Sequence, residues 1–284
     1  MTIKYYPVDL HIHSNASDGK LSASNLVDEA GRRGMKVIAI TDHDTVAGIP
    51  AALERAKKYP ALTVIPGVEI NTDVPGDEVH IMGYYMDYQN QELENSLIRM
   101  RSSRMDRAKK MINLLSDLGL PVDWELVQKI AGKGSIGRPH IAQALQERGY
   151  VQSIKEAFDK YIGRQGPAYA DRDKMLPEEA VRLIKKAGGL AVLAHPASLK
   201  NRDEMLSRLI SAGLIGLEAY YNNYTEETKK ELVSLAKNFG LIATGGSDFH
   251  GLDSANETPM GGVYVPLEAV TKLSLKAKGL LVKG

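Results

Sequence analysis

Two histidines stand one residue apart in the segment DLHIHSNASDG, residues 9–19, directly after an apolar run, and Asp18 follows five residues later. Side chains on a β-strand alternate between its two faces, so His11 and His13 point to the same side. Imidazole nitrogens and carboxylate oxygens are good ligands for divalent transition metals. The spacing therefore predicts one edge of a metal site at the end of this strand.

Similar residues end or follow the other apolar runs of the chain: Asp42, His43, Asp44, Glu69, His80, His195, Glu218, Asp248 and His250. The carboxyl ends of parallel strands converge on one mouth of a barrel, where the loops build the active site. A lone histidine at a strand end is usually a hydrogen-bonded structural residue. Six of the seven histidines at corresponding positions would be costly to desolvate without cations to bind them. We therefore expect a metal centre.

Short, apolar, β-branched segments carry these residues, and they alternate with helical stretches. The expected strands lie within residues 6–13, 36–40, 62–70, 78–85, 189–195, 213–221 and 240–250. Ser22 is expected to cap a helix that runs to about Arg33 and stops at Gly34. Such alternation is typical of parallel βα units and of an α/β class fold.

Residues 91–166 break this rhythm, because helical spacing continues there without a strand signal. Helices are expected from residue 91 to about 118, then near 124–131, 139–148 and 154–162. We interpret the segment as an α-helical insertion that acts as a lid. The expected domains are a metal-binding barrel over residues 1–90 and 167–284, and the lid over residues 91–166.

Composition limits the classes of function. The 284 residues include 36 basic and 35 acidic side chains, so no global field favours stable binding to duplex DNA or to a membrane. The absence of cysteine restricts metal ligands to nitrogen and oxygen. The first residues lack the apolar core of a signal peptide, and no apolar run is long enough to span a membrane. A cytoplasmic protein is expected.

The segment GSIGRPHIAQAL, residues 134–145, predicts a phosphate contact within the insertion. Pro139 is expected at the first position of a helix, and Arg138 and His140 would lie at its N-terminus, where free N–H groups favour an anion. Arginine donors form a planar fork that suits phosphate. Arg104 or Arg107 could meet a second phosphate. The alternative is a surface arginine, a capping histidine and a solvated basic helix.

Seven ordered motifs, namely DLHIHSNASDG, ITDHDT, PGVEI, VHIMGY, GRPHIA, AHP and GSDFHG, resemble the PHP (polymerase and histidinol phosphatase) family. The chain is most similar to its stand-alone nucleotide phosphoesterase branch, which has a helical insertion. The resemblance implies a distorted, TIM-like (β/α)7 barrel with a trinuclear metal centre.

The resemblance also implies a ligand set for three divalent ions, with Mn²⁺ expected first and Fe²⁺ or Zn²⁺ as alternatives. The first ion would be held by His11, His13, Glu69 and Asp248. Glu69 would bridge to a second ion, completed by His80 and His195, and the third would be held by Asp18, His43 and His250. Asp248 or His195 would relay the leaving-group proton, and loss of His43 is expected to remove most turnover.

The expected function is a metal-dependent phosphoesterase that uses a metal-bound hydroxide to release a terminal phosphate from small nucleotides, such as nucleoside 3′,5′-bisphosphates or AMP. The nearest alternative is a 5′-to-3′ exoribonuclease on short RNA oligonucleotides. A histidinol phosphatase, an amidohydrolase with one or two metals, and a non-catalytic phosphate-binding module are less favoured by the residues. The exact substrate, the leaving group, the metal and the oligomeric state stay open.

Two further features are open at this level. Tyr220, Tyr221 and Asn222 follow a strand at the expected mouth, where they could stack a base or pack the end of the barrel. Asp44 could orient a ligand histidine or cap the following helix.

Overall fold

The computed structural model describes residues 5–74, 77–132, 136–171, 175–252 and 257–281. The chain forms two compact units. We call Met1–Ser96 together with Met175–Gly284 the barrel unit, and Leu97–Lys174 the helical unit. No helix among the described residues is both long and apolar enough to cross a membrane.

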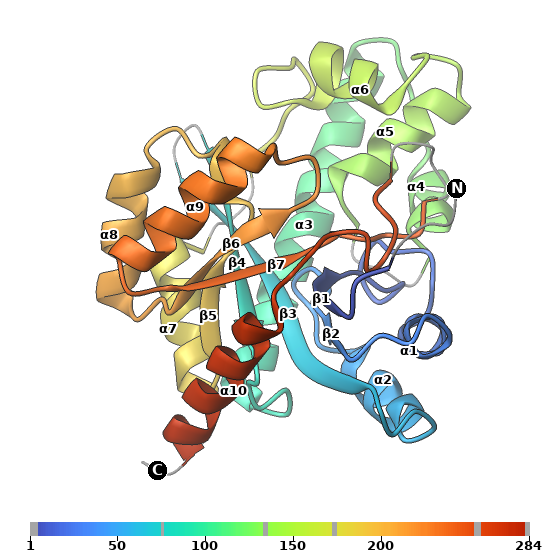
Figure 1. The fold of residues 1–284 in the computed structure, drawn as a ribbon. Coiled ribbons are helices and arrows are strands. Elements are labelled where there is room, and N and C mark those ends of the chain that lie inside the picture. The colour runs from blue at the N-terminus through green and yellow to red at the C-terminus, as the bar shows by residue number, and fades with distance from the viewer. Residues whose placement is uncertain (1–4, 75–76, 133–135, 172–174, 253–256, 282–284) are drawn as a thin grey trace. The chain divides into compact units, whose positions relative to one another are not determined.

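The barrel unit is built on a seven-stranded sheet whose strands follow one another in chain order (Figure 1). Each strand is rich in buried apolar residues, which explains why the segments form strands. The strands are β1 (Val8–Ile12), β2 (Val37–Ile40), β3 (Thr63–Val74), β4 (Asp77–Tyr84), β5 (Leu190–Leu193), β6 (Gly216–Tyr221) and β7 (Ile242–Gly246).

The expectation of purely parallel βα units is wrong at one strand. β4 pairs antiparallel with both β3 and β5, whereas the other neighbouring pairs are parallel. The physical reason is the short connection between β3 and β4, which leaves no room for a crossover helix. The barrel is therefore a mixed sheet, nearly closed on itself.

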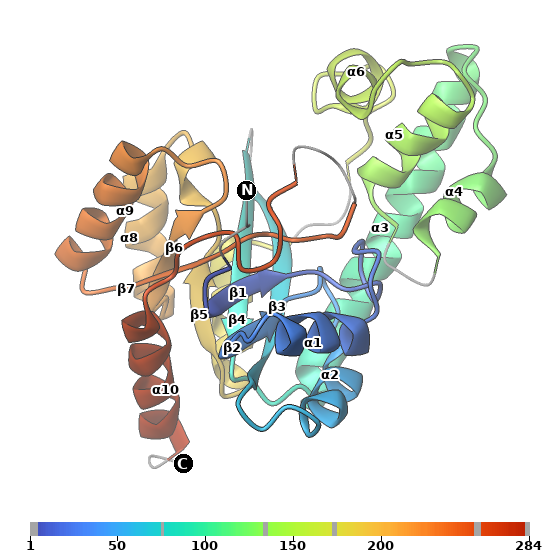
Figure 2. The same cartoon turned by 45° about the vertical axis from the view of Figure 1, so that its right-hand side comes forward.

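Helices cover the outside of this sheet (Figures 1 and 2). They are α1 (Ala23–Arg32), α2 (Ile49–Ala56), α7 (Pro177–Lys186), α8 (Arg202–Ala212), α9 (Glu226–Asn238) and α10 (Leu267–Leu281). Ser22 caps α1 as predicted, since its hydroxyl accepts a hydrogen bond from the backbone N–H of Asn25 at 3.2 Å. Gly34 follows the helix with a φ of 68°.

The first and last strands meet at a seam that is held by few hydrogen bonds among the described residues. Near the mouth, Asp248 N–H donates to the His11 carbonyl at 2.9 Å, and His13 N–H donates to the Phe249 carbonyl at 2.9 Å. Lower down, the buried carboxylate of Asp9 accepts hydrogen bonds from the backbone and hydroxyl of Ser247 and from the backbone of Gly261. Hydrogen bonds to the Asp9 side chain thus take the place of some of the backbone hydrogen bonds expected between β1 and β7.

The helical unit contains most of α3 (Gln91–Asp117), then α4 (Trp124–Ala131), α5 (Arg138–Glu147), α6 (Ile154–Ala157) and a π-helical turn, Phe158–Ile162. It has a hydrophobic core of its own. Met111, Leu115, Ile141 and Leu145 are fully buried there, and Trp124 packs against them. Separate cores agree with the division into two units.

Candidate metal centre

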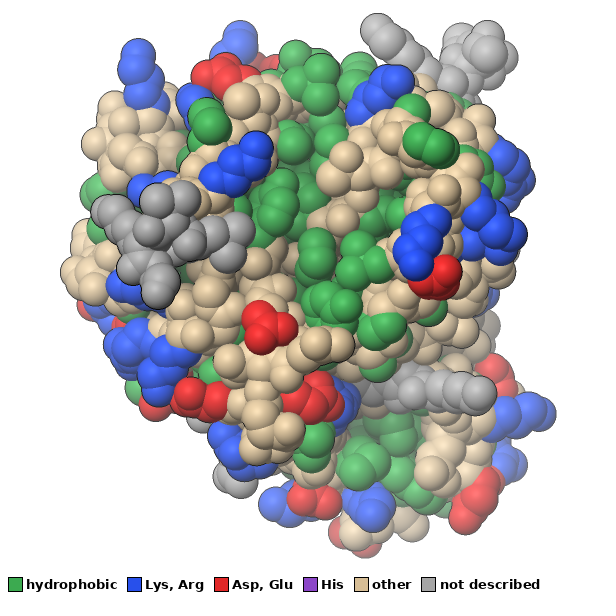
Figure 3. All heavy atoms as spheres, turned by 90° about the horizontal axis from the view of Figure 1, so that it is seen from below, with side chains coloured by type: hydrophobic (Ala, Val, Ile, Leu, Met, Phe, Trp, Pro, Cys, Tyr) green, Lys and Arg blue, Asp and Glu red, His purple; other side chains and the backbone are tan. Residues whose placement is uncertain are grey.

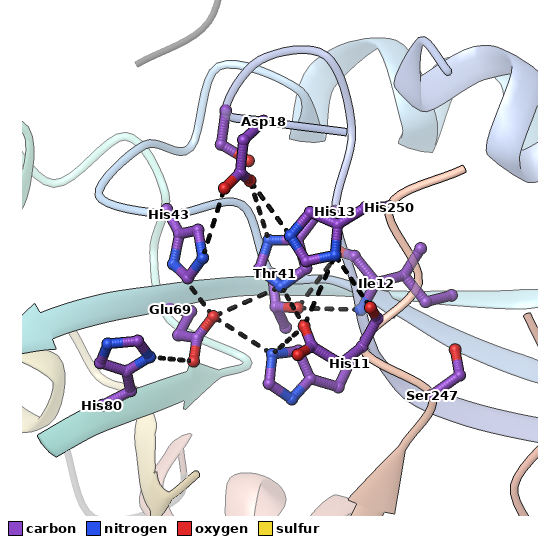
Figure 4. Close-up of polar contacts among 12 residues, drawn as sticks. His11, Ile12, His13, Asp18, Thr41, His43, Glu69, His80, Ser247 and His250 are labelled. Atoms are coloured by element: carbon purple, nitrogen blue, oxygen red, sulfur yellow. Dashed lines mark hydrogen bonds and ion pairs between the residues drawn. The ribbon is translucent and has the colours of Figure 1, made fainter. Parts of the chain in front are cut away.

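Five histidines, together with Asp18 and Glu69, point toward a common centre of the barrel unit in Figure 4, and Asp248 and His195 also lie within 3.3 Å of atoms of this group. His11 lies within β1 and His13 directly after it, and both side chains are fully buried, with ring centroids 5.1 Å apart. The alternation predicted for this strand is therefore present. Among the described side chains on the face drawn in Figure 3, no histidine is visible.

Glu69 on β3 lies at the middle of the cluster. Its Oε2 is 3.1 Å from His11 Nε2 and 3.0 Å from His43 Nδ1. Its Oε1 is 2.9 Å from His80 Nδ1 and 3.2 Å from His195 Nε2. One buried carboxylate thus lies among imidazoles from four different parts of the barrel, a position suited to bridging two cations.

His80 reaches this centre because β4 is antiparallel. His80 pairs with Asn71, two residues beyond Glu69 on β3, so it lies in the first half of its own strand. The first half of an antiparallel strand lies at the same edge as the last half of its neighbours. The prediction that His80 joins the other residues therefore agrees with the structure, although the parallel geometry behind it does not.

Asp18 forms a second group on the outer side of the cluster. Its Oδ1 is 3.3 Å from His250 Nε2, and its Oδ2 is 3.7 Å from His43 Nε2. The His13 and His250 rings stack with centroids 4.2 Å apart. The loop that carries Asp18 is fixed by Asp42, whose carboxylate accepts hydrogen bonds from the backbone and side chain of Ser14.

Asp248 completes the inner group. Its Oδ1 lies 3.0 Å from His13 Nε2 and 3.3 Å from His11 Nε2. Asp248 has a φ of 54° and His195 a φ of 27°, values that side chains other than glycine rarely adopt. Backbone strain of this kind gathers at functional sites, where the surroundings hold it in place.

Unsatisfied nitrogens and oxygens show that the cluster fits metal ions. Neither ring nitrogen of His13 makes a hydrogen bond of acceptable geometry, and Asp18 Oδ1 lacks one as well, although all three atoms are buried. Such atoms are normally satisfied in a folded protein. Three sets have ligand atoms close enough to share an ion: His13, Asp18, His43 and His250; His11, His13, Glu69 and Asp248; and His43, Glu69 and His80.

The pKa shifts in the cluster run in both directions: although burial opposes it, the neighbouring carboxylates raise the pKa values of His11, His195 and His250, the last to about 10. Burial lowers the pKa of His43 to about 3, which keeps its imidazole neutral, as metal ligation requires. Burial alone would raise the pKa of Glu69, but the positive charge of neighbouring imidazoles such as His11 holds it well below its ordinary value. The central carboxylate is therefore ionised and the adjacent His43 is uncharged.

Glu218 is a functional candidate that the ligand prediction left out. It is fully buried at β6, its Oε1 lies 3.0 Å from His11 Nδ1, and its Oε2 accepts the backbone N–H of His195 at 2.8 Å. A carboxylate on the far nitrogen of a ligand histidine fixes the ring and its tautomer. Its position at a strand end was the only sequence signal, and that signal does not separate a ligand from a supporting group.

Asp44 is linked to a ligand histidine through a neighbouring side chain, and it does not cap the following helix. Its carboxylate accepts hydrogen bonds from the backbone and side chain of Asn71, and Asn71 Nδ2 lies 2.9 Å from His43 Nδ1. The N-cap of α2 is Gly48. Asp44 thus acts on His43 through Asn71.

The last two residues of β6, Tyr220 and Tyr221, and the next residue, Asn222, lie in different environments. Tyr221 Oη donates a hydrogen bond to Asp248 Oδ2 at 2.7 Å. Tyr220 packs against the barrel core that contains Val263 and Val265. Asn222 Nδ2 donates to the Ser247 carbonyl at 2.9 Å. Tyr221 therefore contacts the cluster of predicted metal ligands directly, whereas Tyr220 faces away from it.

The residues predicted to bind phosphate lie in the helical unit. Arg138 begins α5 and its guanidinium lies 5.4 Å from the centre of the Phe158 ring. His140 is buried, and its Nδ1 accepts the backbone N–H of Gly137 at 3.0 Å. Arg104 of α3 is 9% exposed, and its Nη1 lies 3.8 Å from the position that a Cβ at Gly137 would occupy. These three side chains thus surround the start of α5.

The chain matches the model of a protein family, and it is similar to several known proteins along most of its length. The family model described as PHP domain matches residues 9–166. A 5′-3′ exoribonuclease of Salmonella typhimurium is 35% identical over 85% of this chain and 84% of its own length. A 3′,5′-nucleoside bisphosphate phosphatase of Chromobacterium violaceum is 31% identical over 86% of this chain and 87% of its own.

A solved structure shares the whole fold. It comes from Bifidobacterium adolescentis, and its name assigns it as a metal-dependent phosphoesterase. The two chains are 30% identical and superpose with a TM-score of 0.85, over 96% of this chain and 97% of the other. The similarity extends over both units of the present chain.

Proposed function

Since this chain belongs to the PHP domain family, we propose that it is a metal-dependent phosphoesterase that releases the terminal phosphate of small nucleotides, such as nucleoside 3′,5′-bisphosphates or AMP. The observation that carries the proposal is the position of Glu69, buried and ionised among imidazoles from β1, β4 and the loops after β2 and β5. Such a set is costly to bury unless cations occupy it.

The proposed centre holds three divalent ions, with Mn²⁺ as the expected metal. Divalent ions in such a centre supply positive charge to the phosphoryl oxygens and lower the pKa of a water molecule toward 7. The protein holds their ligands in place, and Glu69 is shared by two of the sites. The assignment is His11, His13, Glu69 and Asp248 for the first ion; Glu69, His80 and His195 for the second; and Asp18, His43 and His250 for the third.

The protein groups around the cluster have separate tasks. Glu218 fixes the His11 ring, and Asp42 fixes the loop that carries Asp18. The Tyr221 hydroxyl donates a hydrogen bond to Asp248 and so holds that carboxylate toward the cluster. We propose that Asp248 or His195 relays a proton to the leaving oxygen, because both side chains are partly exposed and belong to the cluster.

We propose that residues 91–166, most of which belong to the helical unit, act as a lid and supply the phosphate contacts. Arg138 and His140 lie at the start of α5, where the helix dipole favours an anion. Arg104 adds a second guanidinium beside them. The two arginines would bind a phosphate group of the nucleotide other than the one being hydrolysed.

A second candidate function is a 5′-to-3′ exoribonuclease on short RNA. It is favoured by the match to the Salmonella typhimurium exoribonuclease over most of both chains. The two functions are chemically close, because the 3′-phosphate of a bisphosphate and the first internucleotide phosphate of a 5′-phosphorylated RNA occupy the same position relative to the 5′-phosphate. They differ in whether further nucleotides are attached.

The test is phosphate release and product analysis with Mn²⁺ on a panel of AMP, adenosine 3′,5′-bisphosphate, histidinol phosphate and a short 5′-phosphorylated RNA. Turnover of the bisphosphate or AMP, with little on histidinol phosphate, supports the proposal. Mononucleotide release from RNA at a higher kcat/KM supports the second candidate. The His43→Ala protein is the control that separates this site from a contaminating phosphatase. A flat result over the panel would refute both functions.

A further inference from the structure

A cavity of about 790 Å³ opens on the barrel unit at the end of β6. It is bounded by the end of β6, by one face of α9, and by the segment around residues 258–264. Tyr221 is one of the residues that line the cavity, and its hydroxyl donates a hydrogen bond to Asp248 at 2.7 Å. The cavity therefore begins within the length of one tyrosine side chain from the metal ligands.

The wall formed by α9 is basic. Lys229, Lys230 and Lys237 line the cavity together with a single acidic residue, Glu226. The Glu226 carboxylate pairs with Lys229 at 2.9 Å, so three positive charges face one negative charge and the wall keeps a formal charge of +2. Lysines arranged along a groove attract the phosphates of a nucleic acid backbone.

The opposite wall is aromatic. The Tyr264 ring lies 5.3 Å from Tyr6 and 6.4 Å from Tyr220, edge to face in both pairs. Tyr264 remains 56% exposed, which is unusual for a large aromatic side chain that already packs against two others. Exposed aromatic rings beside a basic wall are the elements that stack and hold single-stranded bases.

We propose that this cavity binds the nucleotides that follow the scissile phosphate of a single-stranded RNA. The proposal rests on the proposed function, because it takes the metal cluster as the place of cleavage. Along α9 the lining runs from Glu226 to Lys237, about 16 Å at 1.5 Å per residue, which gives room for a few nucleotides. The lysines contact phosphates and the tyrosines stack bases.

The consequence is a rule for substrate choice. A nucleoside bisphosphate ends at the phosphate that is hydrolysed, so it has no group that can enter the cavity. An oligonucleotide has its second and later nucleotides there. The cavity thus raises kcat/KM for short RNA and leaves that for a bisphosphate unchanged.

The kinetic test uses the double variant Lys230→Glu/Lys237→Glu, which reverses two exposed charges of the basic wall. Lys57→Glu/Lys58→Glu is the matched control, because it changes the net charge equally at exposed positions at the end of α2. The readout is the ratio of kcat/KM for a 5′-phosphorylated four-nucleotide RNA to that for adenosine 3′,5′-bisphosphate. We expect the ratio to fall about tenfold or more in the cavity variant alone. An unchanged ratio, or the same fall in the control, would overturn the proposal.

A binding test removes the dependence on turnover. The same RNA with a 3′ fluorophore is titrated in EDTA, and its anisotropy gives the affinity at several salt concentrations. Loss of two phosphate contacts makes the slope of log K against log salt shallower by about 1.4. Tyr264→Ala is expected to weaken binding by about five- to a hundredfold, with the slope retained.

The two tests separate the failure of the cavity from that of the catalytic proposal. If the wild-type protein hydrolyses no nucleotide but binds RNA with the expected slope, the cavity proposal stands and the proposed function fails. If the wild type and the cavity variants bind the labelled RNA equally, the cavity proposal fails, whatever the activity of the metal centre.

Discussion

Replacement of Glu218 by glutamine tests how the barrel positions its metal ligands. The carboxylate uses one oxygen for His11 Nδ1, at 3.0 Å, and the other for the backbone N–H of His195, at 2.8 Å. Glutamine keeps the shape but offers one oxygen only. When Nε2 of His11 binds a metal, Nδ1 carries the proton, so both partners of Glu218 are donors. Whichever way the glutamine amide is turned, its NH₂ group faces one of these two donors, and that donor loses its acceptor.

The size of the effect follows from this mismatch. A buried donor without an acceptor costs about 1–3 kcal/mol. Removal of the carboxylate that orients a ligand histidine typically lowers metal affinity or activity about 10- to 100-fold. We therefore expect Glu218→Gln to lose about 1–3 kcal/mol of unfolding free energy without metal, and to bind Mn²⁺ about 10- to 100-fold more weakly.

Two measurements check these values. Urea unfolding in EDTA gives the loss of stability, and the metal content after dialysis against a series of free Mn²⁺ concentrations gives the affinity. Glu204→Gln is the control, because it removes a negative charge from an exposed position on α8. If Glu218→Gln binds Mn²⁺ as tightly as the wild type, Glu218 does not position His11, and the reasoning is refuted.

Four further predictions concern other parts of the molecule. His43→Ala should lose most phosphate release, and normal turnover would remove the third ion from the mechanism. Metal analysis of the Mn²⁺-loaded protein should give three ions per chain, and EDTA should abolish turnover that Mn²⁺ restores; one or two ions would contradict the three-ion assignment and reopen the amidohydrolase alternative. Asp42→Asn should lower the unfolding free energy in urea by about 1–3 kcal/mol, because both carboxylate oxygens accept hydrogen bonds from Ser14; an unchanged midpoint would contradict this. Met111→Ala should cost about 2–5 kcal/mol, since Met111 is fully buried in the helical core, and a loss under 1 kcal/mol would show that the site collapses around the gap.

Part of the site could be predicted from the spacing of residues in the sequence alone. An i, i+2 pair of histidines after an apolar run fixes the side to which both rings point, whatever the rest of the fold. His11 and His13 therefore follow from local geometry, and so does the capping of α1 by Ser22. The approach of Glu69 to four imidazoles does not, because it depends on how four separate segments are placed in the sheet.

The orientation of β4 and the supporting residues show where sequence reasoning stops. An apolar strand has the same pattern whether it runs parallel or antiparallel, so only the short connection after β3 could have predicted the reversal. Glu218 and Asp42 carry the same chemical groups as the expected ligands. Their partners, His11 and Ser14, become known only when the strands are assembled.

The seam between the first and last strands has a consequence for local stability. Its lower part depends on the carboxylate of Asp9, which holds Ser247 and Gly261 by side-chain bonds instead of a continuous ladder. Gly246 stands next to it with no space for a side chain, since a Cβ there would lie 2.4 Å from the Cβ of His11. Amide protons along this line should exchange with deuterium before those of β3 and β4, which makes the junction the first place where the barrel opens.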